Sequence, residues 1–333
     1  MKGSLEIQPF HATSLEGNAL GSATERPLVV YLPPGYSTSS ERYPVLYFLH
    51  GFNGSGLGWL NVTPFAPSVP ERLDGLIAGG KLPPAIGVFI DGFTELGGTQ
   101  WDNSEGMGRY RDYVVRDVVA HADSRFRTKV DAASRALLGK SSGGYGAILI
   151  GGLHADVFGH IASHAGDAYF EYCYLPDFPK AALQLLKGGG VAPWYHDFLR
   201  RGREARHKGD DHAVINVLAM AATYSPKASE PLGLELPFEL QTAAIREDVW
   251  ARWLERDPVR FVPHRLDEYR KLKSIFIDCG TRDDFNIRWG TRMVAAALRK
   301  GGVAVVHEEF EDGHMGINYR YDRSIGYLLP RMG

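Results

Sequence analysis

The 333-residue sequence has only two cysteines, Cys173 and Cys279. Neither lies in a Cys-x-x-Cys pair or in a Cys/His cluster with zinc-like spacing, so the sequence predicts neither a zinc site nor a disulfide framework. Cys279 stands in the apolar run SIFIDCG, where we expect a buried, reduced thiol. His160 and His164 are four residues apart on a candidate strand, and we expect packing there rather than metal binding. No metal and no cofactor is predicted.

Long apolar runs and an excess of one charge are also missing. No stretch approaches the roughly 18 consecutive apolar residues of a membrane span, and the N-terminal segment MKGSLEIQPFHATSLEG lacks the apolar core of a signal peptide. The formal net charge is −2, and the basic run Arg200–Lys208 is typical of a solvated helix face. We therefore expect a cytoplasmic protein with neither a nucleic-acid nor a membrane partner.

What the sequence does contain is an alternation of β-rich runs and helical patterns, which indicates an α/β fold with a mostly parallel sheet of about eight strands. Several runs, such as PVLYFLH and AIGVFI, are almost continuously apolar, as expected of central strands covered on both faces. The candidate strands are Leu5–Thr13, Arg26–Leu32, Tyr43–His50, Ala85–Asp91, Arg135–Gly139, His160–Ser163, Ser274–Cys279 and Val303–Glu309. The candidate helices are Pro70–Ala78, Tyr110–Ser124, Ser142–Leu153, Asn286–Lys300 and Asp322–Leu329.

The alternation breaks between residues 168 and 272, a stretch rich in aromatic residues and proline with several short helical patterns. Strands on either side of it can still be neighbours in one sheet. We therefore expect a single domain over residues 1–333, with a helical cap inserted at about 168–272. The sequence leaves the oligomeric state open, a homodimer being one option.

The segment GKSSGGYGA, residues 139–147, follows an apolar strand and opens a helical pattern. It fits Gly-x-Ser-x-Gly with Ser141 at the centre, whereas Ser142 has Lys140 where the first glycine should stand. A tight turn from strand to helix exposes a nucleophilic serine and aims helix N–H groups at a developing oxyanion. A plain tight turn or a phosphate-binding turn is the alternative, although the P-loop spacing is not met. Ser141 is the candidate nucleophile.

A serine nucleophile needs a base and an acid that orients the base. His314, in the loop of VAVVHEEFEDGHMGINY, is the candidate base, because His307 lies inside the strand. In SIFIDCGTRDDFN three carboxylates compete for the role of the acid. Asp283 is favoured, since Asp278 lies within the strand and Asp284 resembles a helix cap.

The loop HGFNGSG after the strand PVLYFL is expected to supply the second oxyanion donor. The predicted oxyanion hole consists of the backbone N–H groups of Phe52 and Ser142. Further residues in loops at strand ends are candidate substrate contacts: Trp101, Asn103, Asp167, Tyr169 and Met315.

Together with these motifs, RPLVVYLPPGYSTSSERYPVLYFLHG and YRDYVVRDVVAHADSRFRT resemble the esterase family of α/β-hydrolases that includes esterase D, feruloyl esterases and the antigen 85 mycolyltransferases. The resemblance covers about Gly3–Gly166 and Lys273–Tyr319. It implies the α/β-hydrolase fold, with Ser141 as nucleophile, His314 as base and Asp283 as acid.

The expected function is therefore that of a serine carboxylesterase, which hydrolyses a small or aryl carboxylic ester through an acyl-enzyme. The same residues could instead serve acyl transfer to another acceptor or hydrolysis of an amide or peptide. A non-catalytic binding module on a hydrolase fold is the alternative of a different class. Such a module would typically have lost a member of the triad, and the sequence contains a candidate for each.

Overall fold

Eight strands form one mixed sheet in the computed structural model, which describes residues 1–61 and 64–333. The strand order is β1-β2-β4-β3-β7-β8-β9-β10. The pairs β1·β2 and β2·β4 are antiparallel, and the remaining neighbours run parallel. The strands are β1 (Ser4–His11), β2 (Glu25–Leu32), β3 (Val45–Leu49), β4 (Ile86–Ile90), β7 (Arg135–Lys140), β8 (His160–His164), β9 (Ser274–Gly280) and β10 (Val306–Phe310). Each corresponds to a predicted strand, so the predicted fold class is confirmed.

The central strands are buried on both faces, which explains why they read as continuous apolar runs. In β3, Val45, Tyr47 and Leu49 face one hydrophobic core, whereas Leu46 and Phe48 face a second core on the other side of the sheet. Each core is closed by helices. The helices are α1 (Val69–Ala78), α2 (Tyr110–Asp112), α3 (Val119–Arg125), α4 (Ser142–Leu153), α12 (Ile287–Lys300) and α13 (Arg320–Leu328). Residues of α1 and α13 join the core of Leu46, and residues of α2, α3, α4 and α12 join the core of Val45.

The predicted helix Tyr110–Ser124 is correct in extent but not in regularity. Between α2 and α3 the chain forms a π-helical stretch, Tyr113–Val118. Tyr110, Val114 and Val118 of the predicted buried stripe are fully buried, whereas His121 is partly exposed. The wider π turns shift the following residues around the helix axis, so a strict helical period does not describe the whole segment.

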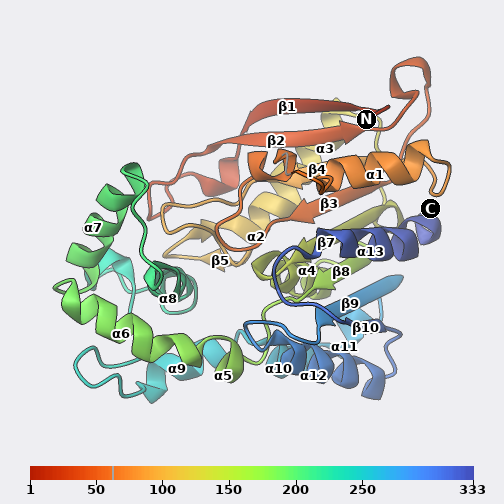
Figure 1. The fold of residues 1–333 in the computed structure, drawn as a ribbon. Helices are drawn as coiled ribbons and strands as arrows, with labels where there is room; N and C mark the ends of the chain where they lie inside the picture. The colour runs from red at the N-terminus through yellow and green to blue at the C-terminus, as the bar shows by residue number, and fades with distance from the viewer. Residues whose placement is uncertain (62–63) are drawn as a thin grey trace.

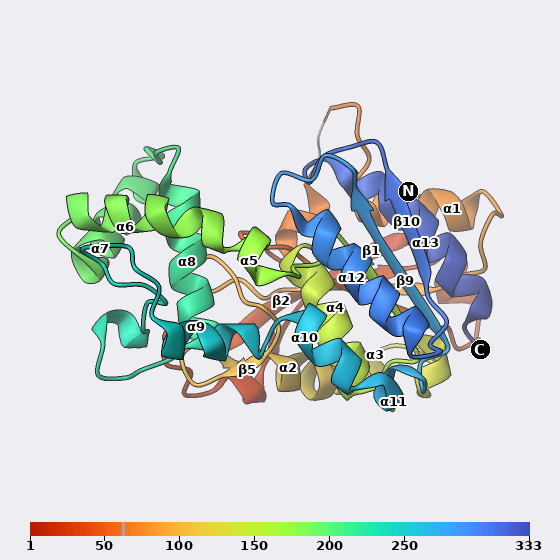
Figure 2. The same ribbon diagram turned by 90° about the horizontal axis from the view of Figure 1, so that it is seen from below.

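The chain between β8 and β9 forms helices that stand largely apart from the sheet. They are α5 (Phe170–Cys173), α6 (Phe178–Lys187), α7 (Val191–Arg203), α8 (Asp211–Tyr224), α9 (Glu247–Leu254), α10 (Pro258–Phe261) and α11 (Leu266–Tyr269). Figures 1 and 2 both show α6–α9 gathered to one side of the strands. By contrast, α10 and α11 pack against α12 and α4, so the last part of the expected cap belongs to the layers that cover the sheet. In the described part of the chain, no helix combines the length and apolar character that crossing a membrane requires.

The segment that contains α6–α9 extends the hydrophobic core of Val45 and carries a charge cluster around one buried carboxylate. The side chains of Trp194, Trp250 and Trp253 are buried in the core. The carboxylate of Glu235, only 6% exposed, accepts hydrogen bonds from Lys227, Arg246 and Arg252. These cations tie α9 to the preceding loop.

Replacing Glu235 by glutamine tests this cluster. Burial alone would raise the pKa of Glu235, but hydrogen bonds from Lys227, Arg252 and Arg246 lower it from its usual 4.5 to about 2. Because the folded pKa lies below the unfolded one, the stabilisation is present above about pH 4.5 and is lost as the pH falls toward 2. At pH 7 we expect Glu235→Gln to lower the free energy of unfolding by on the order of 3 kcal/mol.

Urea unfolding at pH 7 and pH 3 measures the effect. The difference between wild type and variant should shrink to roughly half or less at pH 3. The control is Glu239→Gln, because Glu239 is 64% exposed and pairs with Arg246 at 3.5 Å; this change should cost little at either pH. An equal destabilisation by Glu235→Gln at both pH values would contradict the account.

Candidate active site

Ser141 occupies the turn between β7 and α4, as predicted. Its backbone has φ 56° and ψ −126°, a conformation that costs free energy for any residue other than glycine. Its N–H donates to the carbonyl of His164 at the end of β8 (2.9 Å), which fixes the turn to the neighbouring strand. The side chain therefore stands at the end of the parallel strands, where α/β folds form their sites.

Two glycines leave the space that this turn needs. A Cβ on Gly139 would lie 2.2 Å from the carbonyl oxygen of Gly143, and a Cβ on Gly143 would lie 2.1 Å from the carbonyl oxygen of Leu49. Both distances are far below van der Waals contact. The glycines on either side of Ser141 are thus required by the close approach of β7, α4 and the end of β3.

His314 and Asp283 form a buried pair beside this turn. Nδ1 of His314 lies 2.7 Å from Oδ2 of Asp283, and the side chains are 3% and 0% exposed. Oδ1 of Asp283 accepts the N–H groups of Phe285 (3.0 Å) and Ile287 (3.2 Å). Burial alone would raise the pKa of Asp283, but the hydrogen bond and charge of His314 and these two N–H groups hold it below its usual value. An ionised Asp283 leaves Nε2 of His314 as the nitrogen that can act as a base.

The competing carboxylates have other partners. Oδ2 of Asp284 accepts the backbone N–H of His314 (3.0 Å), so Asp284 holds the loop rather than the imidazole. Asp278 lies within β9 and binds Nδ1 of His164 (2.7 Å) and the guanidinium of Arg320 (2.8 Å). The geometry favours Asp283 among the three candidates.

The loop after β3 borders the same cavity and is held by His50. Nε2 of His50 accepts the N–H of Gly92 (2.8 Å), and Nδ1 lies 2.8 Å from the carbonyl oxygen of Gly51. Burial lowers the pKa of His50, which favours the neutral ring that this pair of contacts requires. Gly51, Phe52 and Ser142 all line the cavity. Phe52 and Ser142 are the two residues predicted to donate their backbone N–H groups to the oxyanion.

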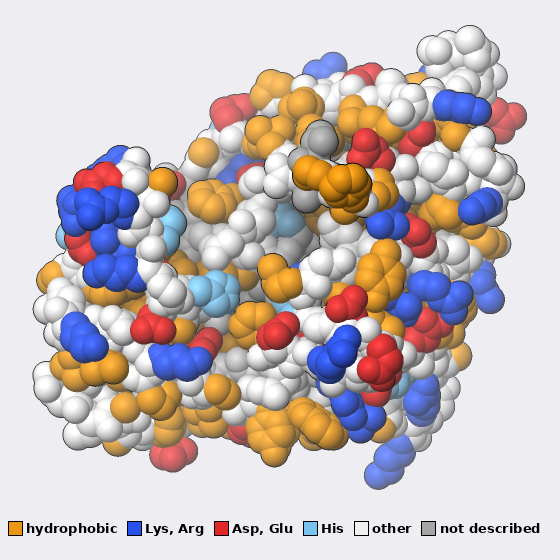
Figure 3. All heavy atoms as spheres, in the orientation of Figure 1, with side chains coloured by type: hydrophobic (Ala, Val, Ile, Leu, Met, Phe, Trp, Pro, Cys, Tyr) orange, Lys and Arg blue, Asp and Glu red, His pale blue; other side chains and the backbone are white. Residues whose placement is uncertain are grey.

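A cavity of about 120 Å³ brings Ser141 and His314 together. Of the predicted substrate contacts, Asp167 and Met315 line it, and Met315 is 70% exposed. Figure 3 shows the surface hollowed between the segment of α6–α9 and the sheet, with histidine atoms visible there.

The other three predicted contacts do not line this cavity. Trp101 is fully buried, and its indole N–H donates to the carbonyl of His50 (3.1 Å), so it supports the loop instead of touching substrate. Asn103 accepts the N–H of Asp112 and borders a separate surface cavity. The ring of Tyr169 packs against Tyr172, with 4.4 Å between the centroids.

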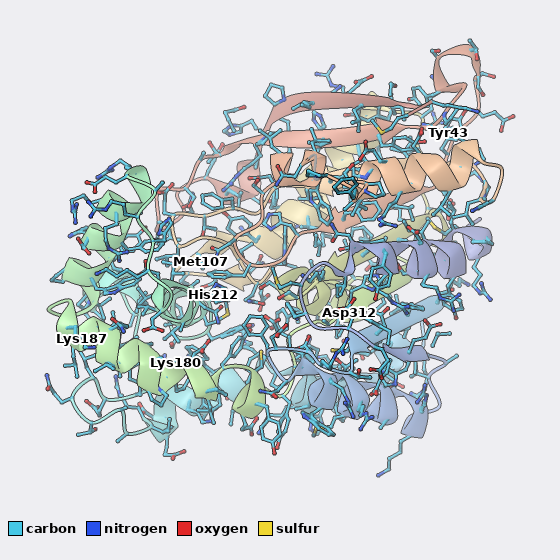
Figure 4. The ribbon with its side chains drawn as sticks, viewed as in Figure 1. Tyr43, Met107, Lys180, Lys187, His212 and Asp312 are labelled. Carbon is cyan, nitrogen blue, oxygen red and sulfur yellow. The ribbon has the colours of Figure 1, made fainter. Side chains whose placement is uncertain are left out.

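Sequence reasoning missed several residues of the cavity wall. They come from the segment after β8 and from the loop after β9: Cys173, Tyr174, His212, Asn216, Phe285 and Ile287. His212, labelled in Figure 4, belongs to α8 and lies within 6 Å, centroid to centroid, of the rings of both Phe52 and Phe285. It also borders a second cavity of about 610 Å³, lined by α7, α8 and the loops around Asn53 and Gly97. Only the aromatic content of YFEYCYLPDFP signalled such a wall.

Both cysteines are buried and free. His160 contacts the carbonyl oxygen of Ala133, and His164 binds Asp278 and Ser324. Within residues 1–61 and 64–333, no group of His, Cys, Asp and Glu side chains could hold a metal ion.

Comparisons with known proteins identify the family and the fold. The sequence profile of a family described as "Putative esterase" matches residues 21–314. An endo-1,4-beta-xylanase/feruloyl esterase of Xylanibacter ruminicola is 32% identical over 168 residues, which are 48% of this chain and 22% of that protein. Esterase Rv1288 of Mycobacterium tuberculosis is 28% identical over 146 residues, 42% of this chain and 28% of that protein. The matches thus span less than a third of the length of either relative.

Solved structures share the fold over almost the whole chain. A ferulic acid esterase superposes with a TM-score of 0.63 at 18% identity and covers 99% of both chains. An S-formylglutathione hydrolase from Agrobacterium tumefaciens superposes with a TM-score of 0.59 at 15% identity, covering 100% of this chain and 96% of the other. At such identities the likeness shows the fold, which is that of the α/β-hydrolases.

The fold places the chain among the α/β-hydrolases, and the family profile agrees with this class. Within that class, the chain belongs to the family described as "Putative esterase".

Replacing Asp283 or Asp284 by asparagine separates the two acidic candidates. Asp283→Asn removes the charge that orients the imidazole and stabilises the imidazolium, so we expect kcat for an ester substrate to fall by about 10³- to 10⁴-fold. Asp284→Asn keeps an oxygen that can accept the N–H of His314, so kcat should change far less. Steady-state kinetics with phenyl acetate, alongside thermal melts of both variants, measure the effects. A larger loss from Asp284→Asn than from Asp283→Asn would refute the assignment.

Proposed function

We propose that the protein is a serine carboxylesterase in which Ser141 is the nucleophile, His314 the general base and Asp283 the acid that orients it. The observation that carries the proposal is the buried His314–Asp283 pair on the same cavity as a serine held in a strained turn. A strained backbone and a buried carboxylate both cost free energy, and their concentration at one cavity is typical of an active site.

In the first half of the reaction, Nε2 of His314 takes the proton of the Ser141 hydroxyl while Oγ attacks the ester carbonyl carbon. The oxygen of the tetrahedral intermediate is stabilised by the backbone N–H groups of Phe52 and Ser142. The intermediate collapses when the bond to the alcohol oxygen breaks, and His314 gives its proton to that oxygen. The alcohol leaves, and the acyl group remains on Ser141.

In the second half, water attacks the acyl carbon and gives its proton to His314. The new intermediate collapses to the carboxylic acid, and the proton returns to Oγ of Ser141. Asp283 stays ionised throughout and stabilises the imidazolium. Every proton moves between the substrate, water and this chain's own side chains, and no cofactor takes part in the proposed reaction.

The two adjacent serines give the sharpest test. Ser141→Ala removes the nucleophile, so kcat/KM for phenyl acetate should fall by about 10⁴-fold or more. Ser142→Ala keeps the backbone N–H and removes only the hydroxyl that accepts a hydrogen bond from Gln100 (2.8 Å). This variant should keep most of the activity and lose about 1 kcal/mol of stability. Near-normal turnover by a folded Ser141→Ala protein would rule out the proposal.

Product analysis in the same assay separates hydrolysis from acyl transfer. With added methanol or glycerol, a carboxylesterase releases mostly free acid from phenyl acetate. Acyl transfer would appear as the acetate ester of the added alcohol.

A further inference from the structure

The carboxylate of Asp167 lines the cavity but has no place in the mechanism above. Asp167 is 5% exposed and follows β8. Its Oδ2 accepts the hydroxyl of Tyr174 (2.8 Å) and the amide of Gln100 (3.3 Å). Among the residues that the structure describes, the hydroxyl of Ser141 is the only donor to its Oδ1, at 3.4 Å. One oxygen is thus fixed to the wall, and the other is turned to the candidate nucleophile.

The charges around Asp167 differ from those around the other buried carboxylates. Across the described residues, no Lys or Arg lies within ion-pair distance of its carboxylate, unlike Asp102, Asp257 and Asp278, which are also buried. Burial raises the pKa of Asp167, although the hydrogen bond of Tyr174 and the charge of His314 oppose the rise. A buried carboxylate without a cation is destabilising unless hydrogen bonds satisfy it. Packing alone therefore does not explain why a carboxylate is buried at residue 167.

Oδ1 of Asp167 can accept a further hydrogen bond. A carboxylate offers about four lone-pair sites, and Oδ1 uses one of its two for a long hydrogen bond. When Oγ of Ser141 is bonded to an acyl carbon, its hydroxyl proton is gone, and Oδ1 loses that donor as well. A donor on the substrate, close to the acyl carbon, would replace it.

The size of the cavity limits what can carry that donor. The cavity beside Ser141 has a volume of about 120 Å³. Pockets that bind drug-sized ligands have volumes of roughly 300–1,000 Å³. The small cavity therefore fits a short acyl group, and the wider cavity beyond His212 is large enough for a bulkier alcohol portion.

We propose that Asp167 is a specificity-determining residue that accepts a hydrogen bond from a hydroxyl on the carbon next to the scissile carbonyl. The substrate class is that of esters of short 2-hydroxy acids. Such a hydroxyl stands three bonds from Oγ of the acylated Ser141, within reach of a carboxylate oxygen that lies 3.4 Å from Oγ. Tyr174 and Gln100 hold the carboxylate in this position. The inference rests on the esterase function proposed above.

The experiment compares phenyl lactate with phenyl propanoate, which differ by one hydroxyl. The measured quantity is the ratio of kcat/KM for the two esters, corrected for their hydrolysis rates in buffer. Wild type should favour the lactate. In Asp167→Asn the ratio should fall by about tenfold or more, because a hydrogen bond to a charged acceptor is lost. The matched control is Asp197→Asn, a carboxylate on α7 that is 43% exposed, and it should leave the ratio unchanged.

If Asp167→Asn does not fold, Tyr174→Phe carries the test. It removes the hydroxyl that fixes Oδ2 and should lower the ratio severalfold while the charge remains. A second pair, 2-hydroxyethyl propanoate and ethyl propanoate, places the hydroxyl on the alcohol side. A preference confined to this pair would overturn the assignment to the acyl group.

The outcomes separate the two proposals. If wild type hydrolyses neither phenyl ester, the proposed esterase function fails. If it hydrolyses both, and Asp167→Asn slows them equally, Asp167 only positions Ser141 and the specificity proposal fails alone.

Discussion

The close approach of β3, β7 and α4 at the turn of Ser141 is the constraint on which the candidate site depends. Three backbone segments meet where a Cβ on Gly139 or Gly143 would overlap a carbonyl oxygen. The chain reverses from strand to helix within this space only because Ser141 adopts a conformation with positive φ. The fully buried helix α4 and the hydrogen bond from Ser141 to β8 hold it there. The free-energy cost of one strained residue is offset by the packing of the sheet around it.

The electrostatics of the site follow from this placement. Strands β8 and β9 end beside the turn of Ser141. The loops that follow these strands carry Asp167 and Asp283, whose hydrogen-bond partners differ. Asp283 interacts with His314 and two backbone N–H groups, whereas the hydrogen bonds to Asp167 come from the neutral groups of Gln100, Ser141 and Tyr174. The difference suits the two proposed roles, since one carboxylate stabilises a developing positive charge and the other retains capacity for a substrate hydroxyl.

Much of this architecture was predictable from local sequence patterns. All eight strands were predicted to within three residues of their bounds, because continuous apolar runs reflect burial on both faces of a central strand. Gly-x-Ser-x-Gly identified the turn of Ser141, because its two glycines report a local steric requirement. The positions of Asp283 and His314 in loops after apolar strands then made them the candidate acid and base. Asp283 and Asp284 are adjacent, and only the fold shows that one binds the ring and the other the backbone of His314.

The wall of the cavity was not predictable in the same way. Trp101, Asn103 and Tyr169 were expected to touch substrate because they follow strand ends, but the direction of each side chain depends on distant packing. Trp101 turns inward to the carbonyl of His50. Tyr174, His212 and Asn216 reach the cavity from the segment between β8 and β9, whose short helices lack a regular hydrophobic period. Their positions depend on contacts between residues far apart in the chain.

Trapping the acyl-enzyme tests most directly whether Ser141 is the nucleophile. Wild-type protein is mixed with phenyl propanoate, quenched with acid within milliseconds, digested and analysed by mass spectrometry. If Ser141 is the nucleophile, we expect a propanoyl group on Ser141 in wild type and none in Ser141→Ala. A propanoyl group on another residue, present in both wild type and Ser141→Ala, would contradict this role for Ser141.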